Sequence, residues 1–144
     1  MPVASENLIA WGDCDAAGIV YYPRFFYFMD VAFQTLLRKA GLNHHILFEQ
    51  FGARVPIVDV SAKFLSPATF EDRLVVGAQV AHWGTKSFRV NYQGARGGVP
   101  VFEGYEVRVW AMVAPDGTIA TAPIAPQFRT ALSAALSAAD PAGQ

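Results

Sequence analysis

The sequence predicts an α+β domain in which an antiparallel sheet of about five strands wraps one long helix. Over residues 23–40 the apolar side chains recur every three or four positions, the spacing of one helix face. Between residues 54 and 113 the pattern changes to alternation, rich in Val, Phe and Tyr and interrupted by turn residues. One helix followed by a run of antiparallel strands is the α+β order.

The first elements are a short strand and the long helix. Residues 5–13 show a loose alternation that we expect to form a strand ending at Gly12. Pro23 suits the first turn of the helix, and Gly41, which follows two basic residues, suits the position just past its end. Additional apolar residues nearly surround this helix, so we expect it to be largely enclosed.

A second, short helix is predicted at residues 45–51, and the strands follow it. Short turns separate the long strands, which predicts an antiparallel meander of four strands at residues 54–64, 72–83, 86–94 and 101–113. A fifth, short strand is expected at residues 118–122 and a C-terminal helix at residues 126–139.

Length and composition indicate one domain that shares part of its surface with another copy. The 144 residues suit a single core, so we expect one domain over residues 1–144, with a frayed tail within residues 136–144. The hydrophobic fraction of 53% is high and the charged fraction of 16% is low, which favours a subunit interface. One helix covers only one face of a sheet, so we expect the other face, with Val and Phe, to need a partner.

Charge and hydropathy exclude several classes of partner. The formal net charge of −1 gives no broad attraction to nucleic acid or to an anionic membrane. The apolar runs are shorter than the roughly 20 residues of a membrane span, and the N-terminus lacks a basic start with an apolar core, so we expect a cytoplasmic protein. Cys14 is the only cysteine, and nothing in the His spacing supports a metal site. We therefore expect no metal, no cofactor and no disulfide.

A loop with two acids, WGDCDAAGIVYYPR at residues 11–24, precedes the helix. Free N–H groups of residues 19–22, near a helix start, favour negative charge and could hold the oxygen of an acyl carbonyl. The Asp15 carboxylate could then act as nucleophile or general base. Its pocket would be walled by Tyr21, Tyr22, Phe25 and Phe26. The alternative is an ordinary helix-capping acid.

The same loop carries a family resemblance. GDCDAAGIVYYPRFF, residues 12–26, resembles the opening motif of the 4-hydroxybenzoyl-coenzyme A thioesterase family, GDCDPAGIVWYP, with Ala16 in place of Pro. The similarity continues through VPIVDVSAKFLSPATFED and KSF to about Trp110. It implies the hot-dog fold, a long helix wrapped by an antiparallel sheet, with homodimers joined through their sheets and commonly assembled into homotetramers.

The resemblance also implies roles for residues of the site. Asp15 would attack the thioester carbonyl or activate water, the backbone N–H of Tyr22 would hold the carbonyl oxygen, and Gly18 would keep the loop compact. Asp13 would cap or orient the loop. Asp30, an acid on an apolar helix, would line the acyl pocket or pair at an interface.

Coenzyme A brings phosphate groups that Lys or Arg normally meets. The family has two arginines before a lysine, whereas this chain has Gly84 and Thr85 before Lys86. Lys86 is the leading phosphate contact, with a solvated lysine as the alternative, and the weaker candidates are Arg89, Arg54 and Arg129. A weaker grip on the nucleotide would fit an acyl carrier other than free coenzyme A.

Three functions follow from these residues. The first is hydrolysis of an aromatic acyl-coenzyme A, either hydroxybenzoyl-like or benzoyl-like, because the expected pocket is rich in Tyr and Phe. The second is hydrolysis of a short-chain aliphatic acyl-coenzyme A, since the same loop serves both. The third is a non-catalytic acyl-binding dimer with the same fold.

Overall fold

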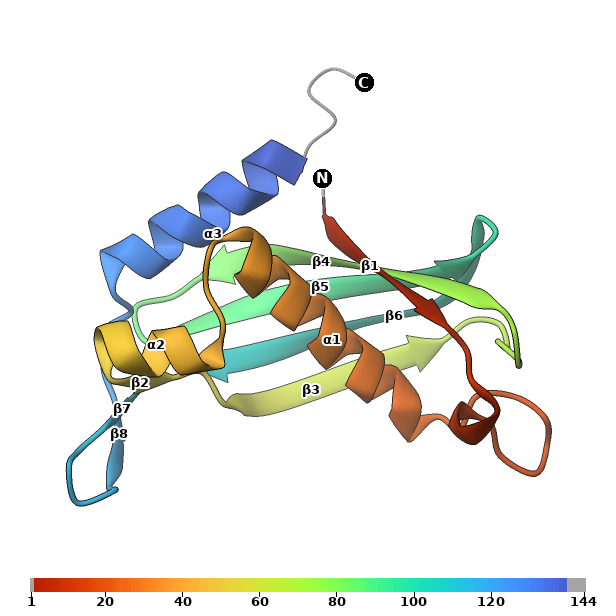
Figure 1. Ribbon diagram of the computed structural model, residues 1–144, viewed down its shortest axis with the longest axis horizontal. Helices are drawn as coiled ribbons and strands as arrows, with labels where there is room; N and C mark the ends of the chain where they lie inside the picture. Colours follow the sequence, from red (N-terminus) through yellow and green to blue (C-terminus); the bar gives the residue numbers. More distant parts are fainter. Residues whose placement is uncertain (1, 140–144) are drawn as a thin grey trace.

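The computed structural model describes residues 2–139, in which α1 packs on one face of a five-stranded antiparallel sheet (Figure 1). A smaller three-stranded sheet lies beside α2, and α3 covers the same end of the molecule. The elements are β1 (Val3–Leu8), η1 (Trp11–Asp13), α1 (Pro23–Lys39), α2 (His44–Phe51), β2 (Ala53–Arg54), β3 (Ile57–Phe64), β4 (Arg73–Trp83), β5 (Ser87–Arg96), β6 (Val99–Val109), β7 (Ala111–Val113), β8 (Ile119–Thr121) and α3 (Pro126–Ala139).

The helix α1 has the bounds that the sequence predicts. Pro23 occupies its first turn, and the chain leaves the helix through Gly41 at φ +77°. Its buried stripe faces β1 and β4 and consists of Phe25, Phe28, Met29, Ala32, Phe33, Leu36 and Leu37. The expectation of a largely enclosed helix is wrong on one side, where Tyr27 is 51% exposed, because one sheet covers only the stripe.

The sheet order is β1-β4-β5-β6-β3, so the expected four-strand meander is only partly correct. β4, β5 and β6 follow one another, but β3 crosses to the far edge and pairs with β6, Phe64 lying opposite Phe102. A tight hairpin between β3 and β4 would need a loop of about two to five residues. Residues 65–72 are longer, and they run beside the acidic loop, where Ala68 O accepts from Val20 N–H.

Two expected strands divide, and one is shorter than expected. Residues 54–64 divide at Pro56, which has no N–H to donate, so that β2 joins β7 in the small sheet. Residues 101–113 divide at Trp110, whose buried ring packs against Phe128 of α3. β1 ends at Leu8, and a 3₁₀ turn replaces the rest of the first strand.

The helix α3 has the bounds that the sequence predicts, residues 126–139. Residues 136–139, which we expected within the frayed tail, therefore belong to α3. Its buried residues include Phe128 and Leu132, whose packing on the sheet stabilises the helix. The rest of the predicted tail, residues 140–144, lies outside the described residues.

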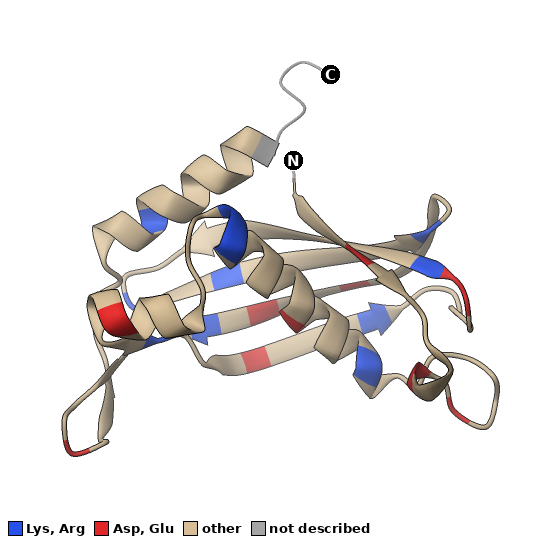
Figure 2. Cartoon of the chain, viewed as in Figure 1, with Lys and Arg blue, Asp and Glu red and all other residues tan. Residues whose placement is uncertain are grey.

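The sheet face turned away from α1 is polar, and the expectation of Val and Phe there is wrong in its centre. Alternation points Phe88, Val90 and Tyr92 toward the helix, so Arg89 and Asn91 face outward. Acidic and basic residues are interspersed along the elements rather than gathered on one face (Figure 2). Exposed apolar side chains lie instead on the edge strand β3, namely Ile57, Val58, Val60 and Phe64. No helix within residues 2–139 is long and apolar enough to cross a membrane.

Candidate active site

The acidic loop folds back on itself ahead of α1. Asp15 N–H donates to Ile19 O at 2.9 Å, and Tyr21 N–H donates to Asp13 O at 2.8 Å. Gly18 N–H closes the bend by donating to Asp15 O at 2.9 Å, with Gly18 at φ +81°. This left-handed conformation favours glycine, and it allows the chain to turn tightly at Gly18.

Asp13 orients the loop from inside. Its side chain is buried, and Oδ2 accepts from Ala10 N–H at 2.8 Å. Oδ1 accepts from Nε of Arg24, in the first turn of α1, at 2.9 Å. Asp13 therefore joins the start of the loop to the start of the helix, which confirms its predicted orienting role.

A second segment holds the loop from outside. Thr69 Oγ1 donates to Gly18 O at 2.7 Å, and Thr69 N–H donates to Asp72 Oδ2 at 2.8 Å. The sequence reasoning assigned no role to Thr69, although it lies in the similar stretch SPATFED. A Thr between Ala68 and Phe70 gives no signal of a contact 51 residues away.

Asp15 is exposed and lines a hollow of about 190 Å³. Its Oδ1 accepts from Ala17 N–H at 2.9 Å, which fixes the rotamer and leaves the second oxygen unengaged by the described residues. The other walls of the hollow are Trp11, Cys14, Ala16, Gly18, Thr69 and Phe70. A carboxylate presented in this way can attack a carbonyl carbon or take a proton from water.

Tyr22 lines the adjoining apolar groove of about 460 Å³. Of the N–H groups expected to be free, those of Val20 and Tyr21 are used by Ala68 O and Asp13 O. Tyr22 N–H has no acceptor within residues 2–139, and it sits at the N-cap of α1, where backbone donors favour negative charge. The other walls are Ile19, Val20, Phe25 and residues 64–68.

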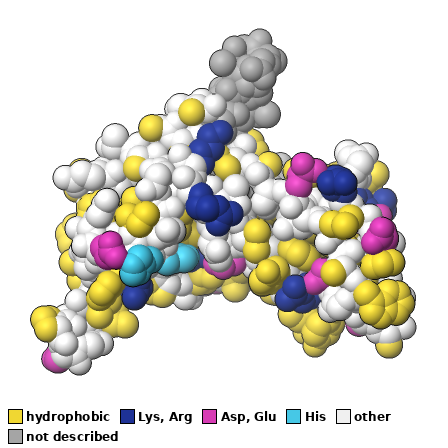
Figure 3. Space-filling model, in the orientation of Figure 1, with side chains coloured by type: hydrophobic (Ala, Val, Ile, Leu, Met, Phe, Trp, Pro, Cys, Tyr) yellow, Lys and Arg dark blue, Asp and Glu magenta, His cyan; other side chains and the backbone are white. Residues whose placement is uncertain are grey.

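Hydrophobic side chains gather over the end of the molecule that holds this loop (Figure 3). Trp11 is 77% exposed, and the ring of Tyr22 packs edge-on against Phe64 of β3 with centroids 6.1 Å apart. Of the other predicted walls, Tyr21 is half exposed and Phe26 packs partly against the core, and neither lines the two hollows. Asp15 and Tyr22 thus lie on two sides of one bend, at the open edge of the sheet.

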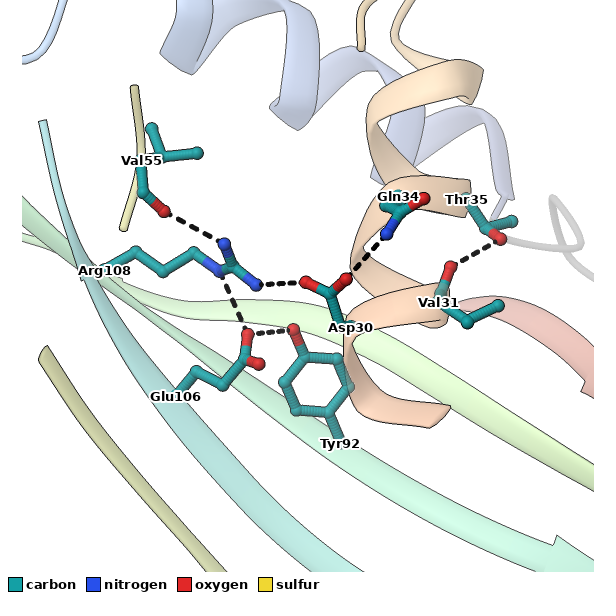
Figure 4. A network of polar contacts seen from close by, with 8 residues as sticks. All are labelled: Asp30, Val31, Gln34, Thr35, Val55, Tyr92, Glu106 and Arg108. Atoms are coloured by element: carbon teal, nitrogen blue, oxygen red, sulfur yellow. Dashed lines mark hydrogen bonds and ion pairs between the residues drawn. The ribbon is translucent and has the colours of Figure 1, made fainter. Parts of the chain in front are cut away.

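Asp30 lies farther along α1 and belongs to a polar network (Figure 4). Its Oδ1 accepts from Arg108 Nη2 at 2.9 Å, and its Oδ2 accepts from Gln34 Nε2 at 2.6 Å. Arg108 also donates to Glu106, which accepts from the hydroxyl of Tyr92. The sequence analysis did not predict Arg108, Glu106 or Tyr92 as members of this network. The available signal was the charged pair Glu106 and Arg108 at alternate positions of one strand, which places both on the same, buried face.

Lys86 and Arg89 do not approach Asp15 within one chain. The first residue of β4 adjoins the acidic loop, whereas its last residue, Trp83, pairs with Phe88 near Lys86. Eleven residues at about 3.3 Å each separate the two ends, a distance on the order of 30 Å. Arg89 lies on the outer face, where its guanidinium stacks 3.8 Å from the ring centroid of Tyr105. Within residues 2–139 no cluster of three His, Cys, Asp or Glu could hold a metal.

A long helix on a five-stranded antiparallel sheet is the hot-dog arrangement, and in this chain the start of the helix carries an exposed carboxylate loop and an N–H that has no acceptor within residues 2–139. The family model described as the thioesterase-like superfamily matches residues 9–132, and the chain belongs to this superfamily. It is an acyl-coenzyme A thioesterase by this membership and by the relatives described next.

The relatives act on aromatic thioesters. The chain is 32% identical over 117 residues to the 4-hydroxybenzoyl-CoA thioesterase of Pseudomonas sp. (strain CBS-3), covering 76% of this chain and 83% of that protein. It is 30% identical over 87 residues to the 1,4-dihydroxy-2-naphthoyl-CoA hydrolase of Thermosynechococcus vestitus, 60% of each. These matches confirm the family resemblance.

Solved structures confirm the hot-dog fold. The Pseudomonas thioesterase superposes with a TM-score of 0.82 at 26% identity, covering 90% of this chain and 97% of that one. A gentisyl-coenzyme A thioesterase superposes with a TM-score of 0.79 at 29% identity, covering 90% and 98%. A variant of the 4-hydroxybenzoyl enzyme, complexed with 4-hydroxybenzoyl-CoA, gives a TM-score of 0.84 at 26% identity, covering 90% and 97%.

Proposed function

We propose that this thioesterase hydrolyses the coenzyme A thioester of a hydroxylated aromatic acid. The observation that carries the proposal is one row on α1, formed by Tyr22, Phe26 and Asp30. These residues are spaced four apart, so they lie along one stripe of the helix, and all three remain partly open to solvent.

The length of the row fits an aromatic acyl group. Eight residues at a rise of about 1.5 Å put Tyr22 and Asp30 about 12 Å apart along the axis. Subtracting two hydrogen bonds of roughly 3 Å leaves roughly 6 Å, the length of one benzene ring with its carbonyl and a para hydroxyl. The N–H of Tyr22 would then hold the carbonyl oxygen, Phe26 would contact the ring, and Asp30 would accept from the hydroxyl. Ring hydroxyls also appear in the substrate names of the relatives.

The chemistry that we propose needs only side chains and water. Asp15 attacks the carbonyl carbon, the negative charge that develops on oxygen is held by Tyr22 N–H, and the coenzyme A thiolate leaves. Water then hydrolyses the mixed anhydride and restores the carboxylate. In the alternative, Asp15 takes a proton from the attacking water and no covalent intermediate forms.

A homodimer belongs to the proposal because the row faces an unpaired sheet edge. Tyr22 touches Phe64 of β3, whose apolar side chains are exposed. Antiparallel pairing of two β3 strands about a two-fold axis would bring the Lys86 end of one copy to the Asp15 end of the other. Lys86 or Arg89 could then meet the phosphates of coenzyme A, and dimers could associate further into homotetramers. The single cysteine, Cys14, suits a reducing, cytoplasmic location.

Thiol release from a panel of coenzyme A thioesters tests the proposal. We expect 4-hydroxybenzoyl-CoA to exceed benzoyl-CoA and butyryl-CoA in kcat/KM. Asp15→Asn should lower kcat about 10²- to 10⁴-fold. The matched control is Asp116→Asn, in the exposed turn after β7, which should retain activity. A preference for butyryl-CoA would support the aliphatic alternative, and no turnover of any thioester would support the non-catalytic one.

A further inference from the structure

We infer that Arg108 is a positioning residue that fixes the Asp30 carboxylate for recognition of a substrate hydroxyl. The inference rests on the proposed function, because it assigns Asp30 to the far end of the acyl site. It goes further by making selectivity depend on three residues of the sheet, Arg108, Glu106 and Tyr92, which touch no substrate.

The donors of Arg108 are directed to three parts of the chain, namely β6, the link between β2 and β3, and α1. Nε donates to Glu106 Oε1 at 3.0 Å, Nη1 donates to Val55 O at 2.9 Å, and Nη2 donates to Asp30 Oδ1 at 2.9 Å. The guanidinium also lies 3.9 Å from the ring centroid of Phe33, which restricts its plane. Such a side chain has one available orientation, and it transmits that orientation to Asp30.

Burial separates the roles of the two acids. The side chains of Arg108 and Glu106 are 4% and 1% exposed, whereas that of Asp30 is 38% exposed. Glu106 supplies the buried counter-charge of Arg108 and is itself held by the Tyr92 hydroxyl at 2.5 Å. Among the described residues that pair with Arg108, Asp30 is therefore the one that solvent or a substrate reaches.

The second contact of Asp30 completes its positioning. Gln34, one turn later on α1, donates to Oδ2 at 2.6 Å. Each carboxylate oxygen accepts from one protein donor and keeps a further lone pair for an incoming hydroxyl. The carboxylate is thus held at both oxygens without being saturated.

Stability alone does not account for this arrangement. Replacing a buried ion pair by well-packed apolar residues is often neutral or stabilising, whereas removing one partner is destabilising. The charged pair is consistent instead with a need for a fixed acceptor at the edge of the acyl site, because hydroxyl selectivity requires a defined geometry.

The test compares 4-hydroxybenzoyl-CoA with benzoyl-CoA in each variant. Arg108→Met should lower the ratio of their kcat/KM values about tenfold or more, as expected for loss of a well-placed hydrogen bond to a charged group. The change should fall mainly on KM for the hydroxylated substrate, because the hydroxyl is remote from the reacting carbonyl. Arg108→Lys should recover part of the ratio, because lysine keeps the positive charge but cannot donate to all three acceptors in the geometry of the guanidinium. The matched control is Arg38→Met, at an exposed position near the end of α1, which should leave the ratio unchanged.

A double variant separates positioning from folding. Arg108→Met leaves Glu106 buried without its cation. Glu106→Gln/Arg108→Met removes this buried charge and keeps an acceptor for the Tyr92 hydroxyl, so it should restore most of the thermal midpoint. Under the inference, this stable double variant keeps the low ratio. Recovery of the wild-type ratio by the double variant would overturn the inference.

Asp30→Asn separates a failure of the positioning role of Arg108 from a failure of the proposed acyl site. A reduced ratio in Asp30→Asn with a wild-type ratio in the double variant rejects the positioning role and leaves the proposed function standing. An unchanged ratio in Asp30→Asn rejects the acyl site along α1 and, with it, the inference. If the ratio falls equally in Asp30→Asn and in the double variant, the result supports both the acyl site along α1 and the positioning role of Arg108.

Discussion

The carboxylate of Asp13 and the guanidinium of Arg24 form a two-donor ion pair, with Oδ1 2.9 Å from Nε and 2.7 Å from Nη2. The same carboxylate holds Ala10 N–H through its other oxygen. One buried acid thereby fixes the position of the acidic loop relative to the first turn of α1. Asp15 and Tyr22, which lie at the two ends of this connection, depend on it for their separation.

The first prediction concerns this pair. Arg24→Met removes both donors and leaves the Asp13 carboxylate buried, so the free energy of unfolding should fall by about 1–3 kcal/mol. Because the loop then shifts against the helix, kcat should fall more than KM changes. Chemical denaturation and steady-state kinetics measure the two effects. Undiminished kcat in a destabilised Arg24→Met would show that the ion pair serves stability only.

The second prediction concerns the bend at Gly18. A Cβ at this position meets no atom within 4 Å, so Gly18→Ala adds only backbone strain at φ +81°, on the order of 1–2 kcal/mol. The strain should displace Asp15, whose carbonyl closes the bend, and lower kcat about tenfold or more.

Gly117→Ala is the matched control for Gly18→Ala. Gly117 lies at φ +87° in the turn before β8 and also has open space at its Cβ. We expect equal thermal destabilisation in the two variants and loss of kcat in Gly18→Ala alone. Equal kcat in both variants would contradict a catalytic role for the bend.

Most of the fold could be predicted because periodicity is a local property. The 3.6-residue pattern of α1 and the alternation of β4 and β5 follow directly from the residues. The crossing of β3 to the sheet edge could not be predicted, because it depends on pairing with residues about 40 positions away, as for Phe64 and Phe102. The alternation within a strand predicts which of its faces is buried, but it does not identify the neighbouring strand.

The candidate site divides in the same way. Asp15, Gly18 and Tyr22 lie on one short loop, so their proximity is readable from sequence. Arg108 contacts Asp30, which is 78 positions away in the sequence. The presence of a charged residue in an apolar strand does not indicate which residue it pairs with. The distance of Lys86 from Asp15 likewise depends on the sheet topology.

The third prediction concerns the edge strand β3. Val60 lies opposite Glu106 on the edge strand β3 and is 40% exposed there, so Val60→Asp places charges at the proposed dimer interface. We expect a monomer by light scattering and loss of most thioesterase activity. Ile119→Asp on β8, at a site 63% exposed, is the control and should leave both unchanged. A monomeric wild-type protein with full activity would contradict the dimer.

The fourth prediction concerns the pH dependence of stability through His44, the first residue of α2. Burial, and then the positive charge of Arg108, hold the pKa of His44 below its ordinary value of 6.5, with Asp30 acting in the opposite direction and Arg54 in the same one. The unfolded chain therefore binds a proton at higher pH than the folded chain does. Stability is retained above 6.5 and is lost as the pH falls from there toward the lower pKa of the folded state.

Thermal midpoints at about pH 7.5 and about pH 5.5 measure this loss, because histidine titrates between them. His44→Gln removes the titrating group, so the difference between the two midpoints should be smaller than in the wild type. His82→Gln, at an exposed position of β4, should keep the wild-type difference. If the two variants lose equal stability on acidification, the burial of His44 beside Arg108 does not set the acid limit of this fold.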